Sequence, residues 1–254
     1  MARLMKRQSN WLNAGFAALS ILTSLPLMAE PDTGNDGIYI LGALHGLHES
    51  EDSFTYDDLR AIITRLNPDI MVLEVRPDEL AEFKDTRGRP EYPEVIWPML
   101  RAGGRAAVAM EPGGEDFDRM TGRAAAAFKA LNQENPAGAA FLRRYRKAFE
   151  TALVSHWESP AQSHDQATAD LVEGYKRVQF SFFDHTQSEN QAEWDGYMAD
   201  IALETARANP QKRILVLGSY RNRHVLEAIV QAGVPDRVRD MKAWLEQDNT
   251  APSQ

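Results

Sequence analysis

Residues 37–75 read GIYILGALHGLHESEDSFTYDDLRAIITRLNPDIMVLEV, and this stretch decides the fold. The run 37–43 is short, apolar and rich in β-formers, whereas 54–66 places apolar residues at helical spacing. Asn67-Pro68 is expected to end the helix, and 69–75 forms a second apolar run. Because the order is strand, helix, strand, the stretch predicts a β-α-β unit with parallel strands and a right-handed crossover.

The rest of the chain continues these patterns. Two more apolar runs, 105–110 and 212–218, predict strands, and the second is the clearest in the chain. The polar, alanine-rich stretch 117–177 predicts a helical insertion that breaks near Asn135-Pro136 and Ser159-Pro160. Further helices are expected at 92–101, 191–208 and 225–233, with a polar loop at 184–190 and a short strand or helix at 237–245.

The alternation of strands and helices predicts an α/β fold. We expect a mixed, largely parallel central sheet flanked by helices, within a single domain over residues 30–245. Strand-loop-helix order near both ends of the chain suggests two related halves, separated by the helical insertion in the middle.

The N-terminus has the layout of a secretory signal peptide. Basic side chains precede an apolar stretch that ends at the small residue Ala29. Polar residues and Pro26 interrupt the apolar stretch, which disfavours a membrane span of about 20 apolar residues. We expect cleavage after Ala29, a periplasmic or secreted product and no stable membrane insertion after cleavage, with an uncleaved anchor as the alternative. The tail 246–254 is expected to be disordered.

Composition limits the classes of partner. The chain has no cysteine, so disulfides and thiolate metal sites are excluded. Without residues 1–29, the 28 basic residues fall to 25 against 37 acidic ones, a net charge of −12. Such a surface disfavours nucleic acid and anionic lipid, so a small molecule or a peptide is the expected partner. Composition carries no prediction of the oligomeric state.

Ionisable side chains follow each of the four clear predicted strands. In a parallel sheet, ligands bind beyond the carboxyl ends of the strands, where side chains from successive strands converge. The residues at these ends are His45, His48, Glu74, Arg76, Glu111, Tyr220, Arg221 and His224.

Histidine and carboxylate side chains at one sheet edge are suited to a divalent metal. His45, His48 and His224, together with Glu74 or Glu111, are candidate ligands for manganese, zinc, cobalt or iron. A metal with an open position acidifies a bound water, which is the chemistry of a hydrolase. A buried carboxylate of the same set is the alternative general base.

Arginine and tyrosine at the same edge are candidates for substrate binding. Arg76 and Arg221 would hold an anionic group, and Tyr220 lies between the last strand and Arg221.

Each of these residues also has a purely structural interpretation. His48 would then cap the following helix or face water, and Glu111 would be an ordinary turn carboxylate. Glu74 and Arg76, which strand alternation places on one face, would form an ion pair at the sheet edge. Arg221 would be a solvated residue before a helix. Three further histidines lie in polar stretches and are expected on the surface, namely His156, His164 and His185.

Four short motifs resemble the TraB/GumN and TIKI-like family. They are the GxxH sequence Gly42-Ala43-Leu44-His45, Glu74 in VLEV, Glu111 in AMEP, and a last apolar strand that ends at Gly218. The family belongs to a wider superfamily with erythromycin esterases and the haem- and iron-binding ChaN proteins. The resemblance extends over about residues 37–232. It implies a sheet of two related halves flanked by helices, and a metal-dependent hydrolase of peptidase or esterase type with its site at the strand ends.

The chain departs from the family pattern at the second GxxH motif. The place reads Gly218-Ser219-Tyr220-Arg221, with arginine where the histidine is expected, and a guanidinium cannot ligate a metal as imidazole does. The helix before that strand reads Glu193-Trp194-Asp195 where the family has Arg followed by Asn or Asp.

These departures leave two alternatives to a hydrolase. One is a non-catalytic protein that binds haem, an iron complex or an anionic small molecule through Tyr220, His224 and His45. The other is a protein whose helical insertion binds a partner, with the strand-end groups as a remnant.

Overall fold

The computed structural model describes residues 36–84 and 88–247, all within one compact unit, Gly34–Gln254. The predicted signal peptide lies outside the described residues. The predicted disordered tail does so from residue 248 onward, and its first residue, Glu246, still belongs to helix α9 (Met241–Glu246).

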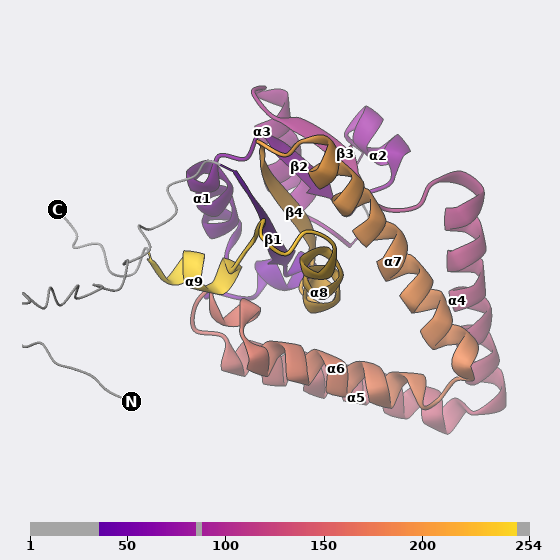
Figure 1. The fold of residues 1–254 in the computed structure, drawn as a ribbon. Coiled ribbons are helices and arrows are strands. Elements are labelled where there is room, and N and C mark those ends of the chain that lie inside the picture. Colours follow the sequence, from indigo (N-terminus) through magenta and orange to yellow (C-terminus); the bar gives the residue numbers. More distant parts are fainter. Residues whose placement is uncertain (1–35, 85–87, 248–254) are drawn as a thin grey trace, which may run out of the picture. The chain divides into compact units, whose positions relative to one another are not determined.

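A parallel sheet forms the centre of this unit (Figure 1). Its described strands have the order β3-β2-β4-β1-β5, and every pairing among them is parallel, so the α/β prediction is confirmed and the sheet is not mixed. β1 and β4 are paired along their whole length, from Gly37 opposite Arg213 to Ala43 opposite Ser219. The strands are β1 (Gly37–Ala43), β2 (Ile70–Leu73), β3 (Ala106–Ala109), β4 (Arg213–Ser219) and β5 (Val238–Arg239).

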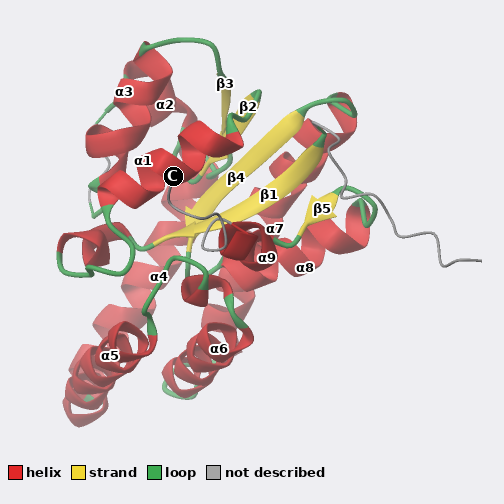
Figure 2. Ribbon diagram, turned by 90° about the vertical axis from the view of Figure 1, so that its left-hand side faces the viewer, coloured by secondary structure: helices red, strands yellow, loops and turns green. Residues whose placement is uncertain are grey.

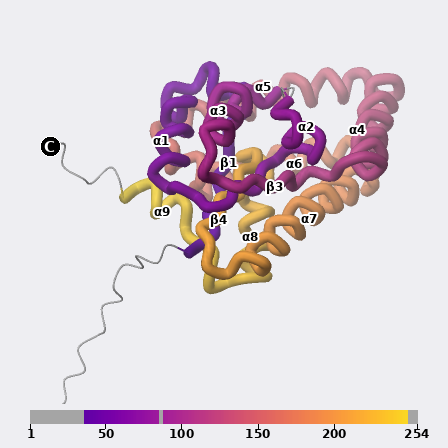
Figure 3. Tube along the Cα trace, turned by 90° about the horizontal axis from the view of Figure 1, so that it is seen from above, coloured from indigo at the N-terminus to yellow at the C-terminus, as the bar shows by residue number. Residues whose placement is uncertain are grey.

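Helices cover both faces of the sheet, which explains why its strands are continuous apolar runs (Figures 2 and 3). Alternate residues of β1 face opposite layers: Tyr39 and Leu41 pack with α1, whereas Ile38 and Ile40 pack with α7 and α8. The first face carries α1 (Tyr56–Leu66), the π-helical turn η2 (Tyr92–Ile96) and α3 (Trp97–Arg101), and the second carries α7 (His185–Ala208) and α8 (Arg223–Gly233).

Local sequence signals explain the first crossover helix. Thr55 and Asp58 form a reciprocal capping box at the start of α1. Asn67 ends the helix in the left-handed conformation, with φ 45°, and the following proline cannot continue it. Two short elements complete this half of the unit, η1 (His45–Glu49) and α2 (Pro77–Glu82).

The central helical segment is longer than predicted. It starts at Gly114 and continues to Ala208, and the predicted break at Asn135-Pro136 separates α4 from α5. The predicted loop at 184–190 is wrong, because Asp184 caps α7 and the helix starts at the next residue. In Figure 1, α4 and α7 lie side by side, and α5 and α6 do the same. The elements are α4 (Gly114–Glu134), α5 (Pro136–His156), η3 (Gln162–His164) and α6 (Gln166–Phe180).

Within residues 36–84 and 88–247, none of the helices combines the length and the apolar character that crossing a bilayer requires.

His164 is buried, so its predicted surface position is wrong. Its Nε2 accepts the Gly42 amide at 3.0 Å, and its Nδ1 lies 3.1 Å from the Pro160 carbonyl and 2.9 Å from the Ser163 hydroxyl. The ring therefore ties the insertion to β1, a contact that depends on the packing of segments distant in the chain. His185 is exposed as predicted, and His156 is half-buried in a 2.8 Å pair with Asp165.

This burial predicts an acid-sensitive fold. Burial lowers the pKa of His164 to about 3, with the charge of Arg223 acting in the same direction. The unfolded chain therefore binds a proton on His164 below about pH 6.5 that the folded chain does not bind. The contribution of neutral His164 to the free energy of unfolding is fully present above that pH. It decreases by about 1.4 kcal/mol for each pH unit as the pH drops toward the pKa of the folded state.

His164→Gln separates this contribution from the other titrating groups, because the glutamine oxygen can still accept the Gly42 amide. We expect the free energy of unfolding of the wild type to decrease by about 2 kcal/mol more than that of the variant between pH 6.5 and pH 4.5. Urea unfolding at each pH measures both slopes. Equal slopes would show that His164 does not stay neutral in the fold.

Candidate functional site

A cleft of about 650 Å³ lies beyond the carboxyl ends of β1, β2 and β4. This is the edge at which parallel α/β sheets bind ligands. The sheet side contributes His45, Glu74 and Ser219, and the helical insertion contributes Arg146 and Glu150. The remaining lining residues are Leu44, Gly46, Leu47, Gly88, Arg89, Gln191, Trp194, Tyr220, Arg221 and Asn222.

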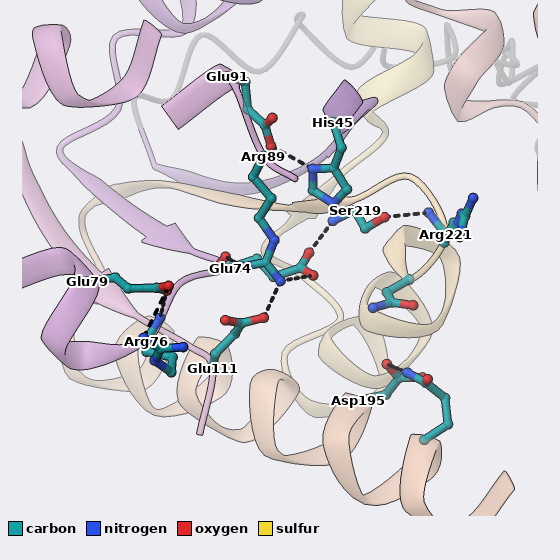
Figure 4. Close-up of polar contacts among 12 residues, drawn as sticks. His45, Glu74, Arg76, Glu79, Arg89, Glu91, Glu111, Asp195, Ser219 and Arg221 are labelled. Atoms are coloured by element: carbon teal, nitrogen blue, oxygen red, sulfur yellow. Dashed lines mark hydrogen bonds and ion pairs between the residues drawn. The ribbon is translucent and has the colours of Figure 1, made fainter. Parts of the chain in front are cut away.

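Arg89 joins two of the predicted acids in a buried cluster (Figure 4). Its Nη2 lies 3.2 Å from Glu74 Oε1 and also donates to Glu111, while its Nη1 donates to the Glu74 carbonyl. Glu74 and Glu111 are 4% and 3% exposed, so both carboxylates depend on this one cation. We call Arg89, Glu74 and Glu111 the Arg89 cluster.

Burial and neighbouring charges shift the pKa values of Arg89 and Glu111. Burial alone would lower the pKa of Arg89, but the adjacent carboxylates outweigh burial and the net shift is upward. Burial raises the pKa of Glu111, and the ion pair with Arg89 offsets only part of that shift. The guanidinium is therefore permanently charged, and Glu111 is the acid that takes up a proton more readily than an exposed glutamate does.

Two paired glycines make room for this arrangement. Gly42 and Gly218 are partners in the β1–β4 register. A Cβ on Gly42 would lie 2.8 Å from the backbone of Tyr220, and a Cβ on Gly218 would lie 3.1 Å from Glu74 Oε2. That same Glu74 oxygen accepts the amide of Ser219. The glycines of the two motifs thus allow the strand ends to approach the glutamate and Tyr220.

His45 is held in the cleft by a buried carboxylate. Its Nδ1 lies 2.6 Å from Oε1 of Glu91, which is fully buried and whose Oε2 has no hydrogen-bond partner in residues 36–84 and 88–247. An ionised carboxylate can only accept, so Nδ1 carries the proton and Nε2 is the free acceptor in the neutral ring. His45 also has φ 55°, a left-handed conformation that costs about 1–2 kcal/mol for a residue other than glycine. The fold therefore maintains a strained backbone at the residue that presents an imidazole to the cleft.

His48 has no nitrogen left for a ligand. The Leu44 amide donates to its Nε2 at 2.9 Å, and its Nδ1 donates to the Phe54 carbonyl at 2.7 Å. Burial lowers the pKa of this histidine, which keeps the ring neutral. His48 therefore has a structural role, but it neither caps α1, which Thr55 and Asp58 do, nor faces water. It braces the turn between β1 and α1.

Arg76 is directed away from the cleft. Its guanidinium binds Asp78 at 3.0 Å and Glu79 at 3.4 Å, and it lies 4.5 Å from the ring centre of Phe117. β2 ends at Leu73, so the alternation expected to place Glu74 and Arg76 on one face does not extend to them. The predicted ion pair between these two residues is wrong, because Glu74 binds Arg89 instead.

Arg221 occupies the place of the second motif histidine and lines the cleft with Tyr220. Its Nη2 lies 2.7 Å from Glu150 Oε1, and its Nε donates to the Tyr220 hydroxyl at 2.9 Å. Arg146 lies 3.6 Å from the same Glu150 oxygen. Two guanidinium groups thus share one carboxylate, which leaves excess positive charge on this wall of the cleft.

His224 lines a different cleft, together with Arg223 and Glu227. Burial lowers its pKa to about 4, with the charges of Lys176 and Arg223 adding to the shift. His45 and Tyr220 line the cleft beyond the strand ends, which His224 does not line. His45, Tyr220 and His224 therefore do not form one ligand set for a metal, an iron complex or a haem.

The donor set does not fit a divalent metal. Glu74 and Glu111 are bridged by a permanent cation, both ring nitrogens of His48 are hydrogen-bonded, and Arg221 replaces the second histidine. In the part of the chain that the structure describes, no three His, Cys, Asp or Glu side chains form a cluster suited to a metal ion. Of the predicted ligands of manganese, zinc, cobalt or iron, His45 keeps its Nε2 for a ligand in this cleft and His224 lines another cleft, so the cleft offers one donor where a metal site needs about three.

Four residues that bind the predicted site residues were not predicted from the sequence. Arg89 and Glu91 lie in a stretch rich in Arg, Gly and Pro for which the sequence predicts no strand, and Arg146 and Glu150 lie on a helix of the insertion. None of them follows a strand, so a search of strand ends cannot find them. The one local signal is a charged residue at every second position in RGRPE, 87–91.

Comparison with protein-family models, with curated proteins and with solved structures gives no match for this chain, so the site is interpreted from its own geometry.

Proposed function

We propose that this chain is a hydrolase of ester or amide bonds, of esterase or peptidase type, in which His45 acts as general base without a metal ion. The observation that carries the proposal is the 2.6 Å contact between His45 Nδ1 and the fully buried Glu91, in a ring that lines the cleft. A buried carboxylate behind an imidazole selects the useful tautomer and stabilises the imidazolium that forms during proton transfer.

The proposed reaction uses groups on both walls of the cleft. His45 Nε2 takes a proton from a water whose oxygen bonds to the substrate carbonyl carbon. Positive charge from Arg221 and Arg146 stabilises the oxyanion that develops. The imidazolium then returns the proton to the leaving oxygen or nitrogen as the ester or amide bond breaks, which restores neutral His45.

In this proposal the Arg89 cluster positions the site and does not act as a base. Glu74 and Glu111 were the candidate bases, but both bind Arg89. Glu74 also accepts the Ser219 amide and so holds the end of β4 beside β2. The resemblance to the TraB/GumN and TIKI-like family, in which His45 holds the GxxH position, supports a hydrolase. The layout of residues 1–29 supports a periplasmic or secreted location.

The test is hydrolysis of a panel of p-nitrophenyl esters and short peptides by the full chain, with and without prolonged dialysis against EDTA. The His45→Ala protein is the blank for contaminating hydrolases. The matched control is His156→Gln, which removes a second histidine-carboxylate pair that does not line the cleft. We expect hydrolysis by the wild type and the control, undiminished by EDTA. No hydrolysis would overturn the proposal, and loss of hydrolysis with EDTA would overturn its metal independence.

A second candidate function uses the same cleft without turnover. Two arginines share Glu150, and an anionic small molecule would compete with that carboxylate for them. Calorimetric titration with citrate and phosphate tests it: binding by a wild type that hydrolyses nothing would favour a binding protein, and no heat with either anion would exclude these ligands.

A further inference from the structure

A groove of about 590 Å³ adjoins the cleft on the side of the helical insertion. It lies between the C-terminal part of α4, the first half of α5 and the second half of α6. Five of its lining residues are apolar or aromatic, and five are polar or charged. The apolar residues are Phe128, Leu131, Ala139, Leu142 and Tyr175, and the polar ones are Asn132, Arg143, Arg146, Gln179 and Arg221.

The groove and the cleft share two arginines as lining residues. Arg146 and Arg221 line both cavities. A smaller cavity of about 140 Å³ also touches Arg221 and Tyr175, and it shares Asn222 with the cleft. A ligand in the groove therefore has one end at the positively charged wall that faces His45.

The charges of the groove are of one sign. None of its lining residues is acidic, and three of them are arginines. Among the described residues, Arg143 binds an amide oxygen, Asn132 Oδ1 at 3.1 Å, and no carboxylate, while Arg146 and Arg221 share the carboxylate of Glu150. These three arginines therefore suit a ligand whose polar end is anionic or develops negative charge.

One apolar side chain of the groove, that of Phe128, is exposed to solvent, whereas Leu131, Ala139, Leu142 and Tyr175 are buried. Phe128 and Phe141, 39% and 41% exposed, are the large hydrophobic side chains left exposed in the described ranges. Phe128 lines the groove, whereas Phe141 does not. The core beneath is small, with Leu131, Ala139 and Leu142 as its buried members. An apolar chain in the groove would cover surface that this core leaves in contact with water.

We infer that the substrate is an ester or amide of a medium- or long-chain fatty acid. Its apolar chain lies in the groove, and its carbonyl lies beside Arg146 and Arg221, within the cleft of His45. The inference rests on the proposed function for the reaction and adds the substrate class. After hydrolysis, the fatty-acid carboxylate would stay beside the two arginines, so the product itself is a ligand.

Product binding tests the substrate class separately from catalysis. We would titrate the full chain with dodecanoate and with hexanoate, below their micellar concentrations, by calorimetry. Each methylene removed from water strengthens binding up to about fourfold, so partial coverage of six methylenes predicts at least about a tenfold preference for dodecanoate. Phe128→Ala is expected to weaken dodecanoate binding by about threefold or more, and Phe141→Ala, an equally exposed phenylalanine outside the groove, to leave it unchanged.

The His45→Ala protein and the p-nitrophenyl esters of acetate and dodecanoate distinguish the two proposals. Chain-length-dependent binding that His45→Ala retains, with no hydrolysis by the wild type, would support the ligand class and overturn only the proposed function. Hydrolysis of both esters at similar kcat/KM, or equal binding of the two fatty acids, would overturn the inferred substrate class. Equal losses in Phe128→Ala and Phe141→Ala would overturn the assignment of the groove.

Discussion

Replacing Glu91 by glutamine is expected to lower kcat for ester hydrolysis by about a thousandfold, while KM changes by less than about threefold. The amide keeps the shape of the side chain, and its oxygen still accepts from His45 Nδ1. It removes the negative charge that stabilises the imidazolium, and it allows the ring to adopt the opposite tautomer. Because Glu91 is fully buried and does not line the cleft, a direct effect on substrate binding is not expected.

A double-variant cycle shows whether His45 and Glu91 act as one unit. His45→Gln and Glu91→Gln, separately and together, should each lower kcat to nearly the same value, because residues that act together give non-additive losses. Thermal unfolding of all three proteins checks that the fold is intact. The role assigned to Glu91 is wrong if Glu91→Gln keeps the wild-type kcat, or if the losses from the two single variants add.

Replacing Arg89 by methionine is expected to lower the free energy of unfolding at pH 7 by about 3–5 kcal/mol, because it leaves two buried carboxylates without their cation. Glu74 and Glu111 are almost fully buried, and Arg89 is the cation that binds both of them. The loss should shrink as the pH falls, since burial raises the pKa of Glu111 and its carboxylate no longer needs a partner once it is protonated. Urea unfolding at pH 7 and pH 5 measures both effects.

Arg76→Met is the matched control for Arg89→Met. Arg76 also binds two carboxylates, Asp78 and Glu79, but its side chain is 26% exposed and Asp78 is 49% exposed. Pairs of this kind contribute about 0–1 kcal/mol, so this variant should remain close to the wild type. Adding Glu74→Gln and Glu111→Gln to Arg89→Met should recover much of the lost stability. Equal destabilisation by Arg76→Met and Arg89→Met would show that the buried cluster has no special role.

The sequence alone determined the frame of the site. The predicted bounds of the first strand match β1, and the capping and proline signals of residues 54–68 place α1 and the crossover to a parallel strand. These features depend on hydrophobic periodicity and on side chains a few positions apart, which are visible along the chain. The same frame places His45, Glu74 and Arg221 at one sheet edge.

Only the tertiary structure decided which group each of these side chains binds. Glu91 is 46 positions from His45, Glu150 is 71 from Arg221, and His164 is 122 from Gly42. Arg89 enters from a loop and takes both predicted metal-binding carboxylates. Local patterns specify which residues reach a strand end. The partner that satisfies a buried charge is set by the packing of distant segments, because burying an unpaired charge costs more than any local preference contributes.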